Sequence, residues 1–177
     1  RGARPAALQS ERARNRVTLQ QHAMLLELLE VPQLMDTCVS NGFYDEALEL
    51  DGYAHKLQQL HPNVRIVDDV AAHVRRSSER LVAQLHAKLR SNLQLPMCLR
   101  VIGYLKRLNV YTERELRVAF LQCRDAWLQS VLAAVPYDTG AYQYLTKLAD
   151  ESRTHLVDII TQYRAIFGDD AAATAAT

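Results

Sequence analysis

Glycine, proline and long apolar runs are scarce in this sequence, and each shortage excludes a class of protein. Glycine occurs six times and proline five times in 177 residues, and the glycine content is roughly half the average usage of about 7%. This composition argues against disordered, collagen-like and glycine-rich phosphate-binding proteins. Apolar stretches such as 23–26 and 131–135 fall far short of the ~20 residues of a membrane-spanning helix, which argues against an integral membrane protein.

Cysteine is also scarce, and its pattern is not that of a disulfide scaffold. The sequence has three cysteines, which is an odd number: Cys38, Cys98 and Cys123. They are widely spaced, and each lies within an apolar helical pattern. Disulfide-rich domains instead have an even, closely spaced set. We therefore expect buried, reduced thiols in a cytosolic protein.

The remaining composition is that of an ordinary soluble globular protein, with 49% hydrophobic residues, 23% charged residues and a net charge of +1. Residue 1 is an arginine and no signal-peptide segment follows, so we expect an internal piece of a longer protein. We predict a basic arm or helix start over 1–16, a single all-α domain over 17–168, and a disordered low-complexity tail over 169–177.

Helical periodicity extends through nearly the whole chain, and no strand or hairpin signal interrupts it. The predicted helices cover 18–29, a short segment from Pro32 to Asn41-Gly42, a segment beginning near Asp45 and Glu46, and 62–93, 97–108, 112–136 and 141–167. Short connections between amphipathic helices favour antiparallel neighbours. The predicted fold is therefore all-α: an irregular stack of antiparallel amphipathic helices forming a rod-like bundle or solenoid.

Several residues predict where individual helices begin, end and pack. Thr112 with Glu115 forms a capping-box pattern at a helix start, and Pro136 is expected to end that helix. Trp127 lies on its apolar face and is predicted to anchor the core. Gly168 is placed for a C-terminal cap of the last helix. A tetratricopeptide-like hairpin over 34–50 has no second copy about 34 residues later, so a repeat array is not expected.

Charge is unevenly distributed along the chain. Between residues 17 and 54 there are seven acidic residues and no lysine or arginine, whereas 72–108 carries eight basic residues against Glu79. We interpret these residues chiefly as solvated helix faces, or alternatively as a surface for anionic lipid or an acidic partner. Nucleic acid is not expected, because no known module and no interleaved aromatic residues are present. The candidate interaction surface comprises Arg75, Arg76, Arg80, Lys88, Arg90, Arg100, Lys106 and Arg107.

Catalytic patterns are missing from the sequence. It contains no GxGxxG, GxxxxGK[ST] or GxSxG motif, no Cys-x-x-Cys, and no paired histidines or Glu-x-x-His at helical metal-site spacing. Asp68 and Asp69 lie near a predicted helix start, where the helix dipole stabilises acidic side chains, and this accounts for the pair without a metal. Asp69 and His73 are four residues apart and are predicted to form a side-chain pair on the helix surface. We therefore expect no enzyme, no metal and no cofactor.

Three blocks of the sequence resemble a known family. They are LLELLEVPQLMDTCVSNGFYDEALEL (25–50), LRSNLQLPMCLRVIGYLKRLNVYTERELRVAFLQCRDAWL (89–128) and the helix that follows. In order and spacing they are similar to the central region of subunit eight of the conserved oligomeric Golgi complex, over roughly 17–167. The pair Asp51-Gly52 departs from that pattern, and glycine inside a helix costs about 1 kcal/mol relative to alanine, so the continuity of that helix is left open.

The resemblance implies a non-catalytic, peripheral tethering subunit on the cytoplasmic face of the Golgi, acting in intra-Golgi retrograde transport and Golgi organisation. It also implies partners: subunit one, the lobe with subunits five, six and seven, and candidate SNAREs or Golgi small GTPases. Two alternatives stay open on the residues alone. One is a stand-alone helical adaptor that binds a peptide helix in a groove, and the other is a helical-bundle enzyme without a recognised motif.

Overall fold

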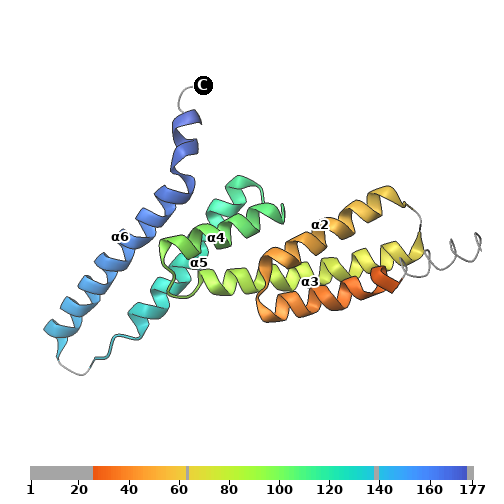
Figure 1. Cartoon of the computed structure of the whole chain (residues 1–177). Coiled ribbons are helices and arrows are strands. Elements are labelled where there is room, and N and C mark those ends of the chain that lie inside the picture. Colours follow the sequence, from red (N-terminus) through yellow and green to blue (C-terminus); the bar gives the residue numbers. More distant parts are fainter. Residues whose placement is uncertain (1–25, 63, 138–139, 175–177) are drawn as a thin grey trace, which may run out of the picture. The chain divides into compact units, whose positions relative to one another are not determined.

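The computed structural model describes residues 26–62, 64–137 and 140–174, with side chains up to Gly168 (Figure 1). Within these ranges every regular element is a helix, which confirms the all-α prediction. A first helix covers 26–41, and the later helices are α2 (Tyr44–Leu60), α3 (Arg65–Leu89), α4 (Leu95–Arg107), α5 (Glu113–Ala133) and α6 (Ala141–Thr174). The predicted basic arm over 1–16 lies outside the described residues.

The chain groups into two compact units, Arg1–Arg80 and Leu81–Thr177. The boundary falls inside α3, and each unit has its own buried residues. In the first unit, Met35 and Ala47 are fully buried, and in the second unit Phe120 and Val101 are. One continuous helix, α3, supplies residues to both units. The single domain over 17–168 stays a prediction.

The first helix differs from its prediction at Pro32. The sequence predicted two helices, one ending at residue 29 and one beginning at Pro32, whereas the structure has one helix over 26–41. That expectation was wrong because Val31, Met35 and Val39, four residues apart, are all buried on one face. The free energy gained by burying these side chains offsets the cost of the backbone hydrogen bond that an internal proline cannot donate. The predicted stop at Asn41-Gly42 is confirmed, because Gly42 has φ +76° just after the helix.

α2 and α3 follow the first helix along the chain. α2 is continuous through Asp51-Gly52, which resolves the question of its continuity. α3 begins at Arg65 and ends at Leu89, so it is shorter than the predicted 62–93. Its buried residues recur at steps of three, four and seven, which is the pattern expected of one helix face; they include Val67, Val70, Val74, Leu81, Leu85 and Leu89.

In the second unit, α5 begins and ends as its sequence predicted. Both hydrogen bonds of the capping box between Thr112 and Glu115 are present. The last helical residue is Ala133, three positions before Pro136, since proline disfavours the helical conformation of the residue before it. α6 packs against both α5 and α4. Trp127, Leu128 and Ile159 form a buried cluster between α5 and α6.

The end of α6 corrects another prediction. The helix continues through Gly168 to Thr174, so the expected C-terminal cap at Gly168 is wrong. The three alanines at 171–173 favour this extension, because alanine has the highest helix propensity of any residue. The tail predicted over 169–177 overlaps this part of α6, and residues 175–177 lie outside the described residues.

Candidate interaction surfaces

All eight residues of the predicted basic surface are exposed, but the structure divides them between the two units. Three lie on the part of α3 that belongs to the first unit (Arg75, Arg76 and Arg80), and five lie in the second unit (Lys88, Arg90, Arg100, Lys106 and Arg107). Lys88, Lys106 and Arg107 occupy the last turns of their helices. A cation there is stabilised by the negative end of the helix dipole, so part of the basic stretch has a local structural role.

Other basic side chains of this set also have partners on their own unit. The Nη2 of Arg100 donates to the hydroxyl of Tyr104 at 3.1 Å, and the Nζ of Lys106 lies 5.9 Å from the ring centroid of Phe167. Arg80 forms an ion pair with Asp36. The interaction role of these residues stays a prediction, and their local contacts account for part of the pattern.

Asp36 joins the first helix to α3 through a polar network that sequence reasoning missed. Its carboxylate accepts hydrogen bonds from Ser77 Oγ and Arg80 Nη2, and its Oδ2 lies 3.3 Å from His73 Nε2. The hydrogen bond from Ser77 is the largest cause that holds the pKa of Asp36 below its usual value; His73 and Arg80 act in the same direction, and partial burial opposes them. His73 thus contacts Asp36 and not Asp69, its predicted partner.

Serine, histidine and aspartate meet here, but their arrangement is not that of a hydrolase triad. In such a triad the serine hydroxyl donates to the imidazole, and the imidazole donates to the aspartate. Here Ser77 Oγ donates directly to Asp36 and lies 3.3 Å from the backbone oxygen of His73. Ser77 is fully buried. The network therefore links two helices and leaves no activated nucleophile exposed.

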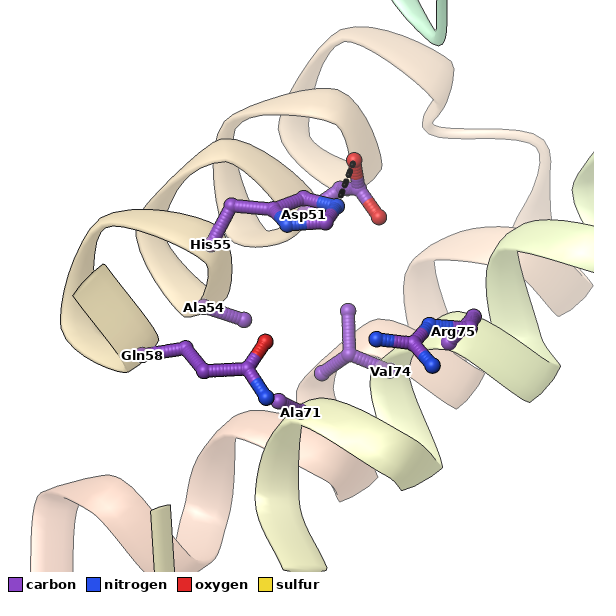
Figure 2. A pocket seen from close by; sticks show the side chains of 7 residues that line it. All are labelled: Asp51, Ala54, His55, Gln58, Ala71, Val74 and Arg75. Carbon is purple, nitrogen blue, oxygen red and sulfur yellow. Dashed lines mark ion pairs between the residues drawn. The ribbon is translucent and has the colours of Figure 1, made fainter. Parts of the chain in front are cut away.

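A second polar contact joins Asp51 of α2 to α3. The carboxylate of Asp51 accepts a hydrogen bond from Ser78 Oγ on α3, and His55 Nε2 lies 3.9 Å from it. Figure 2 shows a small pocket between the two helices, lined on one side by Asp51, Ala54, His55 and Gln58 and on the other by Ala71, Val74 and Arg75. Its volume of about 10 Å³ is close to the minimum needed for one water molecule. The pocket is too small for an organic substrate.

In the second unit, a fully buried arginine holds the end of α3. The Nη1 of Arg124 donates to the backbone oxygens of Leu89 at 3.1 Å and Ser91 at 2.7 Å. Leu89 is the last residue of α3, where helix carbonyls lack a partner within the helix. Burial lowers the pKa of the Arg124 guanidinium. Sequence reasoning missed Arg124. It directly follows Cys123 in the chain and so does not share the helical spacing of the apolar face on which the buried Cys123 lies.

Histidine and cysteine side chains of this unit are placed in the interior or against aromatic rings. His155 lies edge-on to Trp127 with ring centroids 4.8 Å apart and pairs with Glu151 at 3.0 Å. Cys98 and Cys123 are buried, Cys38 of the first unit is half-buried, and all three are free thiols. Burial raises the pKa of the Cys98 thiol, which disfavours the reactive thiolate. The predicted burial is confirmed for Cys98 and Cys123 but not for Cys38, and the reduced state of the three thiols stays a prediction.

Within residues 26–62, 64–137 and 140–174, no group of three or more histidine, cysteine, aspartate or glutamate side chains could hold a metal ion. None of the helices in the described part of the chain combines the length and apolar character needed to cross a membrane.

Comparison with known proteins connects this architecture to a family. The model of the Dor1-like family matches residues 3–177. The chain is 52% identical over 163 residues to conserved oligomeric Golgi complex subunit 8 of Homo sapiens, which covers 92% of this chain and 26% of that protein. It is 47% identical over 165 residues to the subunit 8 of Drosophila melanogaster, covering 93% of this chain and 29% of that protein.

The likeness also reaches more distant organisms. The chain is 40% identical over 152 residues to conserved oligomeric Golgi complex subunit 8 of Dictyostelium discoideum, covering 86% of this chain and 20% of that protein. This chain spans about a quarter of the length of the curated relatives it matches. No solved structure matches it. The resemblance read from the three sequence blocks is confirmed, and because the family model covers nearly every residue, the chain belongs to the Dor1-like family.

Proposed function

We propose that this chain is a segment of a non-catalytic subunit of a Golgi vesicle-tethering complex, and that it acts through protein–protein interaction. The observation that carries the proposal is the identity of about half its residues, over more than nine-tenths of its length, with proteins named as conserved oligomeric Golgi complex subunit 8. Proteins with that level of identity share a common fold, so we expect the same arrangement of helices to present a partner surface in this chain.

The chemistry of the described residues supports a role in binding. The Ser77, His73 and Asp36 side chains are engaged with one another and lack triad geometry. Large apolar side chains are instead displayed on the surface of several helices, among them Leu29 at 58% exposure and Val157 at 57%. Exposed apolar side chains are typical of surfaces that dock other proteins when they gather into patches.

The finer proposal concerns the complex and its place in the cell. The chain acts in intra-Golgi retrograde transport and Golgi organisation as a peripheral component on the cytoplasmic face of the Golgi membrane. Its partners are the other tethering subunits: subunit one and the lobe with subunits five, six and seven. SNAREs and Golgi small GTPases are further partners, and nucleic acid is not one.

Exchange of this segment into a relative tests the proposal in an intact protein. In human cells lacking conserved oligomeric Golgi complex subunit 8, the human protein would be expressed with its matching region replaced by residues 3–177, the range that the Dor1-like family model matches. We expect the chimera to co-purify the other subunits and to localise to the Golgi. The measurement is quantitative mass spectrometry of the purified complex together with imaging of the tagged chimera.

Two variants of the chimera make the result interpretable. Phe120→Asp places a charge at a fully buried position of the second unit and should abolish co-purification, because an unpaired buried charge disrupts the core. Gln122→Asp adds the same charge at an exposed position of the same helix and should leave it intact. A stable chimera that localises elsewhere and recovers none of the subunits would overturn the proposal and favour the stand-alone adaptor.

The basic residues of the second unit are proposed to add a weak, salt-sensitive attraction for acidic membranes. Charge neutralisation of Lys88, Arg90 and Arg107 to glutamine should reduce flotation of the protein with vesicles containing anionic lipid, because screening and loss of charge both weaken such attraction. Flotation that does not depend on anionic lipid would remove this part of the proposal.

A further inference from the structure

A groove of about 460 Å³ opens within the second unit, between the C-terminal end of α5 and the beginning of α6. The α5 side and the segment after it are apolar and consist of Val131, Ala134, Val135 and Pro136. The α6 side is charged and consists of Lys147, Asp150 and Glu151. The groove therefore combines an apolar floor with a polar rim, as expected of a site for an amphipathic ligand.

The groove is attached to a well-packed part of the core. Val131 lines it and also packs against the buried cluster of Trp127, Leu128 and Ile159. The space exists because α5 ends at Ala133, so that beyond this residue small side chains and a proline replace the helix that would otherwise fill it. The packing of Val131 thus connects one end of the groove floor to the buried cluster.

The electrostatic character of the groove favours a cation. Two carboxylates, Asp150 and Glu151, stand against the single ammonium group of Lys147; Glu151 also lies 3.0 Å from His155 Nε2, whereas no ion pair is recorded for Asp150 among the described residues. The C-terminal end of α5 adds the partial negative charge of the helix dipole, and the last turn of this helix contains no basic residue to neutralise it. The rim thus repels anionic lipid headgroups and attracts lysine or arginine.

We propose that this groove binds an amphipathic helix of a partner protein, with one large apolar side chain on the floor and flanking lysine or arginine residues against Asp150 and Glu151. Helix-in-groove binding uses this combination of apolar anchors and charged flanks. The volume accommodates a small number of side chains. Tyr137 follows Pro136 directly and is 69% exposed, and its ring lies edge-on to that of Tyr144 on α6, with centroids 5.1 Å apart. The proposal requires only a partner of this chemistry and does not rest on the tethering function.

Two matched synthetic peptides test the proposal. Both form a short helix with the same leucine stripe; one has lysine and the other glutamate at every flanking position. Fluorescence anisotropy with the 177-residue chain should show binding of the lysine peptide about tenfold tighter than that of the glutamate peptide, since complementary rim charges favour one and oppose the other. The double variant Asp150→Lys/Glu151→Lys should reverse this preference.

Matched controls separate the groove from general charge attraction. Glu46→Lys/Glu49→Lys makes the same charge change at exposed positions of α2 and should leave the preference unchanged. Ala134→Trp fills the groove and should weaken both peptides. Amide chemical-shift mapping of the unsubstituted chain should place the lysine peptide at 131–136 and 147–151, and this measurement does not depend on the folding of any variant.

Several results would overturn the proposal. They are equal affinity for both peptides, a preference that survives reversal of Asp150 and Glu151, shift changes confined to other helices, or no binding up to about 1 mM. A concentration-dependent dimer that Ala134→Trp abolishes would also overturn it, because a second copy of this chain would then be the occupant of the groove.

Discussion

The guanidinium carbon of Arg124 lies 4.0 Å from the ring centroid of Trp127, the residue three positions later on α5. Both side chains are buried, and Arg124 is not exposed at all. The aromatic face attracts the cation, while two backbone oxygens at the end of α3 accept its hydrogen bonds. One pair of residues thus holds the end of α3 and the side of α5 together within the second unit.

Replacement of Arg124 should be strongly destabilising. Arg124→Met keeps an apolar stem but leaves the carbonyls of Leu89 and Ser91 without their donor, and hydrogen bonds to a charged group contribute about 1.5–3 kcal/mol each. We expect a loss of about 3 kcal/mol in the free energy of unfolding, measured by urea denaturation. Arg114→Met on the exposed side of the same helix should change it by less than about 0.5 kcal/mol. Equal effects of the two substitutions would contradict this role for Arg124.

Trp127 should be an anchor of the core and should be coupled to Arg124. Its side chain is 6% exposed, so Trp127→Ala should cost about 3–5 kcal/mol through lost burial and a cavity. In a double-mutant cycle with Arg124→Met, the coupling energy should be about 1–2 kcal/mol, as expected of a desolvated cation–aromatic contact. The cycle of Trp127→Ala with Arg114→Met, whose sites lie several helical turns apart, should be additive. Additivity in both cycles would mean that the contact contributes nothing.

Two glycines should respond to alanine in opposite directions. Gly52 lies inside α2, and a Cβ atom added there meets nothing within 4 Å, so Gly52→Ala should stabilise the protein by about 0.5–1 kcal/mol through higher helix propensity. Gly42 has φ +76°, a conformation that costs other residues roughly 1–2 kcal/mol, so Gly42→Ala should destabilise it. Thermal melting of both variants checks the prediction, and a shift in the same direction for both would be inconsistent with it.

His86 should make stability depend on pH in the mildly acidic range. Burial, with a further contribution from Arg90, holds the pKa of His86 below its ordinary value of 6.5, and its Nε2 is buried without a hydrogen-bond partner among the described residues. The unfolded chain therefore binds this proton at higher pH than the folded one does. As far as His86 contributes, the free energy of unfolding is highest above about pH 6.5 and decreases progressively as the pH falls below that value.

Comparison of variants isolates the contribution of His86. Between about pH 7.5 and about pH 5.5, His86→Gln should lose less of its unfolding free energy than the unsubstituted protein does. His61→Gln, at an exposed position after α2, should retain the full pH dependence. The unfolding free energies would be measured by urea denaturation at these pH values. If that of His86→Gln fell with pH as steeply as that of the unsubstituted protein, the burial of His86 would have no thermodynamic consequence.

Local sequence was sufficient for most helix positions. The capping box at Thr112 and Glu115 and the stop at Gly42 were predictable because each depends on residues within one helical turn. The errors at Pro32 and Gly168 have one cause. In both places a residue that often ends a helix lies inside one, because favourable burial on one side of Pro32 and high alanine propensity after Gly168 outweigh it.

By itself, the sequence determined that this protein is helical and to which family it belongs, because helical periodicity and long sequence blocks are properties of the linear chain. Only the tertiary structure decided that Ser77 and Arg80 meet Asp36, that Arg124 binds the end of α3, and that a groove with a charged rim opens beside α5. Each of these depends on residues from different helices, and their pairing follows from how the helices pack, which residue spacing within one helix does not specify.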